Sequence, residues 1–406
     1  MFCRHCGREL SSDAMYCSGC GVPVGSIPSA DDGKGKGSGS NPIKVLVLVV
    51  VVLVACAALL IVMSDVSEPS VTKGSVTISG GLVNEDIAID DDGLEFTGSG
   101  DVSWAYLDTS LPYLELNGSE YSVREHTMVD GPSLSVPSPG VYDVLLIVDG
   151  TERYHGVMIL DGEISRTYEW TAAIGGYERS FSVDLTYTLS EYLAYSDDDA
   201  IRYSVPTLSD SRFVVTDGPI FRLSSALADE YRSVFGYDAP TEGQDYADYL
   251  LSFVQCTIAY PDPVTYSDGM YVSDEDGSGD LYLYGVSEYW AYPIEVLHRS
   301  SGDCEDTSFL LCSILSVSGY DSAIVMMPSH MMVAVELESF GFRPVVGGLV
   351  PTYKKVVGHE YNIYFCETTY NRFVPVGYMA SGLHDKVMSE VEDVTFVNSV
   401  LRWSYT

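Results

Sequence analysis

The last third of the chain contains three residues that together could perform nucleophilic catalysis: Cys304, His330 and Glu367. A cysteine attacks a carbonyl carbon as its thiolate, a histidine removes the thiol proton, and a carboxylate orients the imidazole ring. The order cysteine, histidine, carboxylate along the chain is compatible with such a triad. The expected chemistry is the attack of a thiolate on an amide or peptide bond, with an acyl-enzyme intermediate.

A helix is expected to position Cys304. Apolar residues recur with helical spacing through residues 307–319, and Asp303 is a plausible N-cap, which puts Cys304 in the first turn. The positive end of the helix dipole favours a thiolate there. Glu305 and Asp306 oppose that effect, so the thiol still needs a histidine partner.

Strands are expected to position the other two residues. The pattern predicts strands over 323–327, 330–337 and 361–369, with His330 opening the second and Glu367 on the third. Neighbouring antiparallel strands bring side chains such as these within reach of each other.

The motifs around these residues resemble the transglutaminase-like superfamily of papain-like thiol enzymes, in its prokaryotic, membrane-linked form. They are PIEVL at 293–297, GDCED at 302–306, a histidine shortly before VAVEL at 333–337, and CETT at 366–369. The resemblance covers roughly residues 165–380. It implies Cys304 as nucleophile, His330 as base, and Glu367 in the place usually held by aspartate. The FVQ segment at 253–255 also resembles the family, which implies Gln255 as a donor to the oxyanion.

Two CxxC pairs at the N-terminus predict a metal site: Cys3, Cys6, Cys17 and Cys20. Two such turns complete a tetrahedral site of four sulfurs, which binds structural Zn²⁺ and leaves no open position for catalysis. Residues 2–24 resemble the short zinc-ribbon domains found at the head of many prokaryotic membrane proteins. The alternative of two redox CxxC motifs lacks the surrounding βαβ pattern. The thiol chemistry itself requires no cofactor.

The stretch from Val45 to Met63 contains nineteen residues without a charge or a proline, which predicts one membrane-spanning helix. Lysines precede it and acidic residues follow it. The positive-inside rule then predicts a cell-membrane protein with a cytoplasmic zinc ribbon and residues 66–406 extracytoplasmic.

Charge is distributed unevenly. The net charge is −37, but residues 1–65 contain five basic and five acidic side chains, so the whole excess lies in residues 66–406. So acidic a surface repels phosphate backbones, and nucleic acid is excluded as a partner of this part. The acidic loop 274–280 has a glycine, Gly285, where a calcium-binding loop needs glutamate. It is interpreted as a solvated loop.

The expected fold class is a multidomain chain. Short strands with turn residues near every tenth position indicate a β-sandwich-like module, and the mixed order of strands and helices after it indicates an α+β domain. The expected domains are a zinc ribbon (1–24), a flexible linker (25–43), a transmembrane helix (44–64), a β-sandwich-like module (72–163) and an α+β transglutaminase-like, papain-like domain (164–406).

The expected function is that of a membrane-anchored, extracytoplasmic cysteine peptidase or amidase acting on a protein or peptide. Transfer of the acyl group to an amine instead of water stays open. The alternative is a non-catalytic binding, scaffolding or transmembrane signalling protein that retains the fold. The zinc ribbon could bind a cytoplasmic protein partner.

Overall fold

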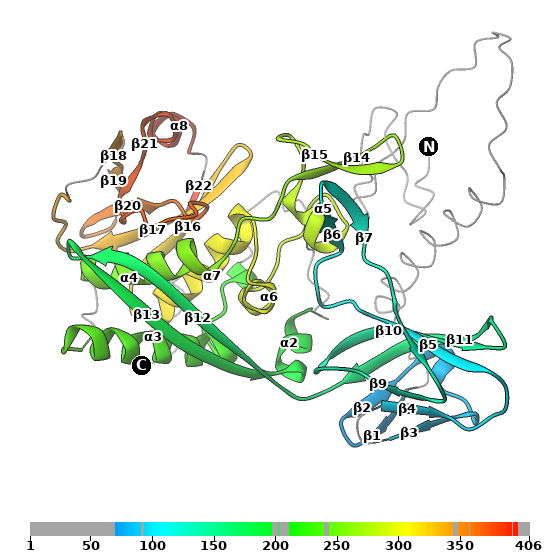
Figure 1. Ribbon diagram of the computed structural model, residues 1–406. Coiled ribbons are helices and arrows are strands. Elements are labelled where there is room, and N and C mark those ends of the chain that lie inside the picture. The colour runs from blue at the N-terminus through cyan, green and yellow to red at the C-terminus, as the bar shows by residue number, and fades with distance from the viewer. Residues whose placement is uncertain are drawn as a thin grey trace, which may run out of the picture. The chain divides into compact units, whose positions relative to one another are not determined.

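The structure is a computed structural model, and it describes residues 70–90, 93–196, 202, 211–238, 243–343, 348–356, 358–391 and 393–396. Within these ranges the chain forms two compact units (Figure 1). The first comprises residues 70–110 and 124–161. The second comprises residues 111–123 and the described residues from 162 onward.

The described residues form mostly β-sheets, with seven α-helices. None of these helices is long and apolar enough to cross a membrane. The longest, α3 (Gly218–Phe235), has charged residues along one face and buried apolar residues on the other, as a helix packed against a core requires.

The expected fold class and localisation therefore need correction. The lack of a membrane-crossing helix among the described residues contradicts a single-pass membrane protein with residues 66–406 outside the cell. Together with the predominance of β-sheets, it also contradicts the expected fold class, which contained a transmembrane helix and an α+β papain-like domain. The segment 44–64, on which the membrane prediction rested, lies outside the described residues.

The first unit contains a six-stranded and a three-stranded antiparallel sheet. The six-stranded sheet has the order β1-β2-β11-β10-β5-β8, and the other has the order β3-β4-β9. The strands are β1 (Val71–Lys73), β2 (Val76–Ile78), β3 (Ile87–Ile89), β4 (Gly93–Phe96), β5 (Val102–Asp108), β8 (Thr127–Asp130), β9 (Ser133–Ser135), β10 (Gly140–Val148) and β11 (Thr151–Leu160), with a short 3₁₀ helix, η1 (Gly80–Leu82).

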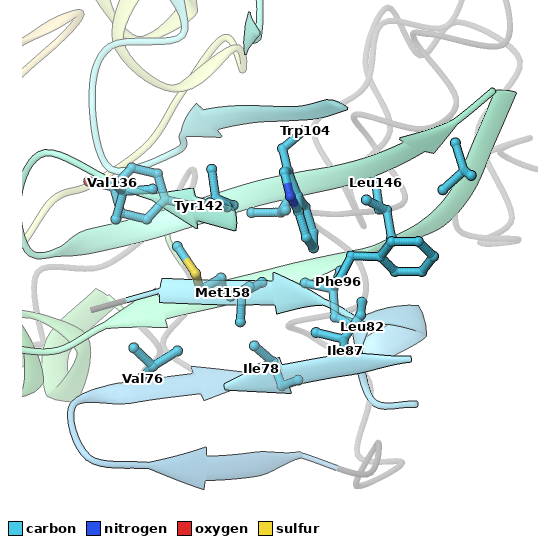
Figure 2. Close-up of a cluster of buried hydrophobic side chains, with 14 residues drawn as sticks. Val76, Ile78, Leu82, Ile87, Phe96, Trp104, Val136, Tyr142, Leu146 and Met158 are labelled. Atoms are coloured by element: carbon cyan, nitrogen blue, oxygen red, sulfur yellow. The ribbon is translucent and has the colours of Figure 1, made fainter. Parts of the chain in front are cut away.

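Both sheets contribute to the core of this unit (Figure 2). Tyr142, Val144 and Leu146 alternate along β10 and are at most 1% exposed, as the period of two in a strand dictates. They pack with Trp104 from β5 and Leu94 from β4. Alternating residues of strands from both sheets therefore form the core of this unit.

The second unit begins with a long hairpin. Its strands β12 (Glu163–Ile174) and β13 (Tyr177–Thr188) pair over their whole length and alternate buried and exposed residues. Helix α3 packs against β13, and α4 (Gln244–Thr257) packs against β12. Trp170 is buried there and donates its indole N–H to Ser252 Oγ on α4 at 3.0 Å.

Helix α7 (Cys304–Val317) lies at the centre of this unit. It packs against β16 (Ser322–Met327) and β17 (His330–Leu337) on one side, and against α3, α4 and α6 (Pro293–Arg299) on others. Its apolar residues Leu310, Leu311 and Ile314 are fully buried, which holds the helix and therefore its first residue in place.

A five-stranded sheet with the order β19-β20-β17-β16-β22 contains these two strands. The remaining elements of the unit are β6 (Leu114–Asn117), β7 (Glu120–Val123), α2 (Leu189–Ser196), η2 (Ser211–Phe213), β14 (Val264–Ser267), β15 (Met270–Ser273), α5 (Gly279–Tyr284), β18 (Leu349–Pro351), β19 (Tyr353–Lys355), β20 (Asn362–Cys366), β21 (Tyr378–Ala380), α8 (Ser381–Glu390) and β22 (Asp393–Phe396).

One hairpin joins distant parts of the sequence. Strands β6 and β7 leave the first unit's stretch of chain and form a four-stranded sheet with β14 and β15, through the pairing of Tyr121 with Tyr271. Residues 111–123 therefore belong to the second unit, although the first unit's sequence surrounds them.

Candidate functional site

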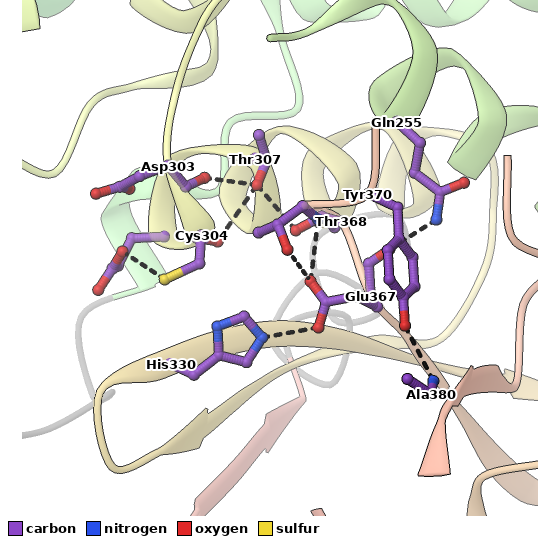
Figure 3. Close-up of polar contacts among 11 residues, drawn as sticks. Gln255, Asp303, Cys304, Thr307, His330, Glu367, Thr368, Tyr370 and Ala380 are labelled. Atoms are coloured by element: carbon purple, nitrogen blue, oxygen red, sulfur yellow. Dashed lines mark hydrogen bonds and ion pairs between the residues drawn. The ribbon is translucent and has the colours of Figure 1, made fainter. Parts of the chain in front are cut away.

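Cys304 is the first residue of α7, as the sequence predicted, and Asp303 occupies the N-cap position. Cys304 is 8% exposed. Its thiol donates a hydrogen bond to Glu305 Oε2 at 2.9 Å (Figure 3). The side chain of Asp303 makes no capping hydrogen bond. The position of Cys304 therefore depends on the packing of the buried residues of α7.

The surroundings of Cys304 favour the neutral thiol over the thiolate. Burial raises its pKa well above the ordinary range, and the carboxylates of Glu305 and Asp303 raise it further, while the Met331 backbone lowers it by a smaller amount. Burial is the main cause, and the carboxylates that add to it are those of Glu305 and Asp303, whereas the sequence had suggested Glu305 and Asp306.

His330 and Glu367 meet from neighbouring strands. His330 is the first residue of β17 and Glu367 follows the last residue of β20, which pairs antiparallel with β17. His330 Nε2 lies 2.7 Å from Glu367 Oε2. The contact between the Cys304 thiol and the Met331 backbone puts the thiol beside the start of β17, and Figure 3 shows the imidazole between the thiol and the carboxylate.

Glu367 is held as a carboxylate although it is 2% exposed. Its other oxygen, Oε1, accepts hydrogen bonds from the Thr369 backbone N–H at 3.0 Å and from Thr369 Oγ1 at 2.7 Å. Burial alone would raise the pKa of this carboxyl group, but His330 and Thr369 outweigh burial and lower it below the ordinary value. Glu367 therefore accepts the hydrogen from His330 Nε2.

Two threonines connect the helix to the carboxylate segment. Thr307 Oγ1 and Thr368 Oγ1 lie 2.8 Å apart, and Thr307 also donates to the Asp303 carbonyl at 2.6 Å. Sequence reasoning did not assign roles to Thr307, Thr368 or Thr369. The signal was present in the CETT motif, where two hydroxyl residues directly follow the glutamate.

Gln255 lies on the other side of Glu367 from Cys304 (Figure 3). It is 1% exposed, and its Nε2 donates to the Glu367 carbonyl at 2.7 Å. Its Oε1 accepts from the Val374 backbone N–H at 2.8 Å. The side chain thus connects α4 to the segment that contains Glu367, and its two ends are bonded to the main chain.

The glutamate of the PIEVL motif has a structural environment. Glu295 is 1% exposed and forms a buried ion pair with Arg202, with Arg202 Nη1 2.6 Å from Glu295 Oε2. Tyr289 donates its hydroxyl to the other carboxylate oxygen at 2.8 Å. The motif therefore fixes α6, which packs against α7, and does not contribute a reacting group.

Two clusters of acidic and thiol groups are close enough to hold a metal ion. One contains Asp303, Cys304 and Glu305, and the other contains Asp280, Asp303 and Asp306. In each cluster, one ligand atom from every residue lies within 4.8 Å of the others. The four cysteines predicted to bind zinc, Cys3, Cys6, Cys17 and Cys20, lie outside the described residues.

Comparison with known proteins identifies one part of the chain. A zinc-ribbon domain model matches residues 2–24, which confirms the module predicted from the two CxxC pairs. Neither a curated protein nor a solved structure matches the chain. The match implies structural zinc, and the donor set of four cysteines in two CxxC turns fits that metal.

Proposed function

We propose that the second unit is a cysteine-dependent enzyme that cleaves or transfers an amide or peptide acyl group. The observation that supports this proposal is the arrangement of Cys304, His330 and Glu367, which come from the start of a helix and from two adjacent strands. Their order and motifs resemble the transglutaminase-like superfamily. The packing of the fold does not require a thiol, a histidine and a carboxylate side by side at one site. Nucleophilic catalysis does require these three groups next to one another.

The bond between His330 and Glu367 determines which ring nitrogen acts as the base. A carboxylate accepts only, so Nε2 has the hydrogen and Nδ1 has the free lone pair. Nδ1 then removes the thiol proton of Cys304, which must first leave its hydrogen bond with Glu305. Displacement of Glu305 from the thiol, by a substrate or by an alkylating reagent, would make this transfer possible.

The proposed reaction proceeds in two stages. The thiolate attacks the carbonyl carbon of the amide, the C–N bond breaks, and the imidazolium of His330 gives its proton to the departing amine. Water then attacks the thioester, His330 removes the water proton, and the C–S bond breaks to return the thiol. An amine in place of water gives acyl transfer.

Alkylation rates test this proposal. A thiol-directed reagent at neutral pH is expected to label Cys304 faster than Cys256, although Cys256 is the more exposed of the two. Faster labelling of a more buried thiol reports chemical activation and not access. Labelling of Cys304 that is slower than or equal to that of Cys256 would contradict the enzyme proposal.

A variant with a matched control strengthens the test. His330→Ala is expected to slow the labelling of Cys304. His359→Ala removes another histidine that is paired with a glutamate, Glu336 on β17, at 2.8 Å, and it is expected to leave labelling unchanged.

A second candidate function, a non-catalytic binding protein, is favoured by the raised pKa of Cys304 and by its hydrogen bond to Glu305. Both keep the thiol protonated and unreactive. This candidate predicts that labelling of Cys304 stays slow and does not respond to His330→Ala.

We further propose that the zinc ribbon binds one structural Zn²⁺ through Cys3, Cys6, Cys17 and Cys20. Metal analysis of the purified chain is expected to find about one zinc per chain, and the Cys3→Ser/Cys17→Ser double variant is expected to lose it. Retention of zinc by that variant would contradict the assigned ligands.

A further inference from the structure

A second group of side chains lies beside the catalytic cysteine and has no role in the proposed reaction. Asp280 is the second residue of α5, Asp303 is the N-cap of α7, and Asp306 is in the first turn of α7. One carboxylate oxygen from each lies within 4.8 Å of the other two. Two segments that are more than twenty residues apart therefore bring three acids together.

Two of these carboxylates, those of Asp280 and Asp306, are buried, and each has a hydrogen-bond partner for only one of its two oxygens. Asp280 is 1% exposed and Asp306 is not exposed at all. Asp280 Oδ2 accepts from the Tyr289 backbone N–H at 2.7 Å, and Asp306 Oδ1 accepts from the Ala291 backbone N–H at 2.7 Å. Their remaining oxygens, Asp280 Oδ1 and Asp306 Oδ2, are buried without a hydrogen-bond partner.

Asp303 completes the set. It occupies a helix N-cap, where an aspartate ordinarily accepts a hydrogen bond from the first turn, but its side chain makes no such bond. Its Oδ1 is also buried without a partner. Buried polar atoms are nearly always paired in native proteins, so three orphan oxygens in one cluster indicate a missing positive group.

Two ordinary ways of neutralising buried carboxylates leave these three oxygens without a partner. A side-chain hydrogen bond joins Asp303 to Glu305, so one proton can be shared there, but Asp280 Oδ1, Asp303 Oδ1 and Asp306 Oδ2 still have no hydrogen-bond partner. A lysine or arginine could also neutralise them. However, none of the ion pairs that the structure gives within its described ranges includes Asp280, Asp303 or Asp306.

A hard divalent cation does fit. Calcium binds oxygens at about 2.3–2.6 Å, so two oxygens on opposite sides of one ion are about 4.6–5.2 Å apart. Three oxygens within 4.8 Å of one another can therefore all contact a single ion. Carboxylates without nitrogen or sulfur favour calcium, magnesium or manganese over zinc and copper.

We propose that Asp280, Asp303 and Asp306 bind one hard, oxygen-preferring divalent cation such as Ca²⁺. This site is additional to the zinc ribbon and to the proposed reaction. The two backbone N–H groups from Tyr289 and Ala291 orient the ligands, and the loop 274–280 leads directly into the site. The loop was expected to be solvated, but its last residue, Asp280, is buried.

Calcium titration of the full chain tests the proposal. The chain is first dialysed free of calcium and magnesium, and its zinc content is measured to verify that the ribbon keeps its metal. Calorimetry is expected to show saturable binding of one Ca²⁺ per chain, and Tm is expected to rise with Ca²⁺ because the ion binds only the folded state.

Isosteric variants locate the ion. Asp280→Asn and Asp306→Asn are each expected to weaken Ca²⁺ affinity by about tenfold or more and to remove the calcium-dependent rise in Tm. Asp276→Asn changes an exposed acid of the preceding loop and is the matched control, with unchanged binding expected. The proposal is overturned if the unmodified chain binds neither Ca²⁺ nor Mg²⁺, or if both site variants bind as it does.

Tb³⁺ luminescence of the unmodified chain tests the cation site even if the aspartate variants do not fold. Tb³⁺ is a hard, oxygen-binding ion whose emission is excited by nearby aromatic rings, and the Tyr284 side chain is close enough to Asp306 to interact with it electrostatically. Sensitised emission that Ca²⁺ displaces is expected, with a weaker signal in Tyr284→Phe. Absence of displaceable emission from the unmodified chain would overturn the proposal.

Discussion

Two histidine–glutamate pairs each have one member on strand β17, and they differ in what surrounds them. At its start, His330 Nε2 is 2.7 Å from Glu367; near its end, Glu336 accepts from His359 Nδ1 at 2.8 Å. Both glutamates are buried, at 2% and 7% exposure. By these measures the two pairs are equivalent.

The two pairs differ in the group that lies next to the histidine ring. The ring of His330 lies beside a thiol at a helix start, and it bonds its glutamate through Nε2, so Nδ1 is the nitrogen that we propose as the base. The ring of His359 uses Nδ1 for its glutamate and stacks on Phe396, with ring centroids 3.7 Å apart. A histidine–carboxylate pair therefore does not define a catalytic site; the bonded nitrogen and the group facing the other one do.

The largest expected effect that tests this comparison is loss of the base. His330→Ala is expected to slow alkylation of Cys304, and any amide hydrolysis, by about 10²–10⁴-fold, since that is the usual contribution of a general base. Single-exponential labelling rates followed by mass spectrometry measure it. An equal effect of His359→Ala would remove the distinction between the two pairs.

Changing the carboxylate tests the assignment of the ring nitrogens. Glu367→Gln keeps the shape but offers an amide N–H, which favours the tautomer with its hydrogen on Nδ1 and so blocks that nitrogen as a base. A loss approaching that of His330→Ala is expected. Glu336→Gln is the matched change at the other pair, and a comparable loss in that variant would contradict the assignment.

A cluster in the first unit extends the comparison to pH. Asp143 accepts from His126 at 2.9 Å and from His155 at 2.6 Å, with no thiol among the residues that it bonds. Burial tends to raise the Asp143 pKa, but the two histidines outweigh it and lower the pKa to about 2. The bond to Asp143 raises the pKa of His155, against the opposing effect of burial.

The signs of these shifts define a stability window. The contribution of Asp143 is present above its unfolded pKa of 3.8 and is lost as pH falls toward 2. The contribution of His155 is present below its unfolded pKa of 6.5 and is lost as pH rises through the raised folded value. The cluster thus stabilises the first unit most between about pH 4 and 6.5.

Thermal unfolding against pH measures that window. Asp143→Asn is expected to lower the free energy of unfolding by on the order of 2 kcal/mol near pH 5 and to flatten the pH dependence. It should leave Cys304 labelling unchanged. A variant whose stability follows the same pH profile as the unmodified chain would show that Asp143 is not the titrating partner.

The smallest expected effect concerns the support of Glu367. Thr369→Val removes the hydroxyl that donates to Glu367 Oε1 at 2.7 Å and keeps the backbone donor at 3.0 Å. A cost of about 1 kcal/mol, or a several-fold slower labelling of Cys304, is expected. Thr352→Val removes a hydroxyl bonded to His384 in the same unit and should not change that rate.

Local elements could be predicted from the sequence because their signals are local. The period of apolar residues located α7, and the strand that opens with His330 was identified to the residue. Antiparallel neighbours were enough to predict that His330 and Glu367 lie within reach. The zinc-ribbon module followed from the spacing of four cysteines, and the family match confirms it.

Other features depend on tertiary contacts that no local pattern encodes. The bonds of Gln255 to Glu367 and Val374 join residues more than a hundred positions apart, so its sequence motif alone suggested a different role. The convergence of Asp280 with Asp303 depends on how α5 packs. The membrane prediction came from an apolar run in a segment outside the described residues, and the finding on the described helices contradicts it.

The hairpin of β6 and β7 has a consequence for the order of folding on the ribosome. Tyr121 pairs with Tyr271, a residue synthesised 150 positions later. At about 5–20 residues per second, one edge of β7 waits roughly 8 to 30 seconds before its partner strand emerges. Unpaired strand edges invite pairing with other chains, so a nascent chain that stalls before residue 271 is expected to be prone to aggregation through β7.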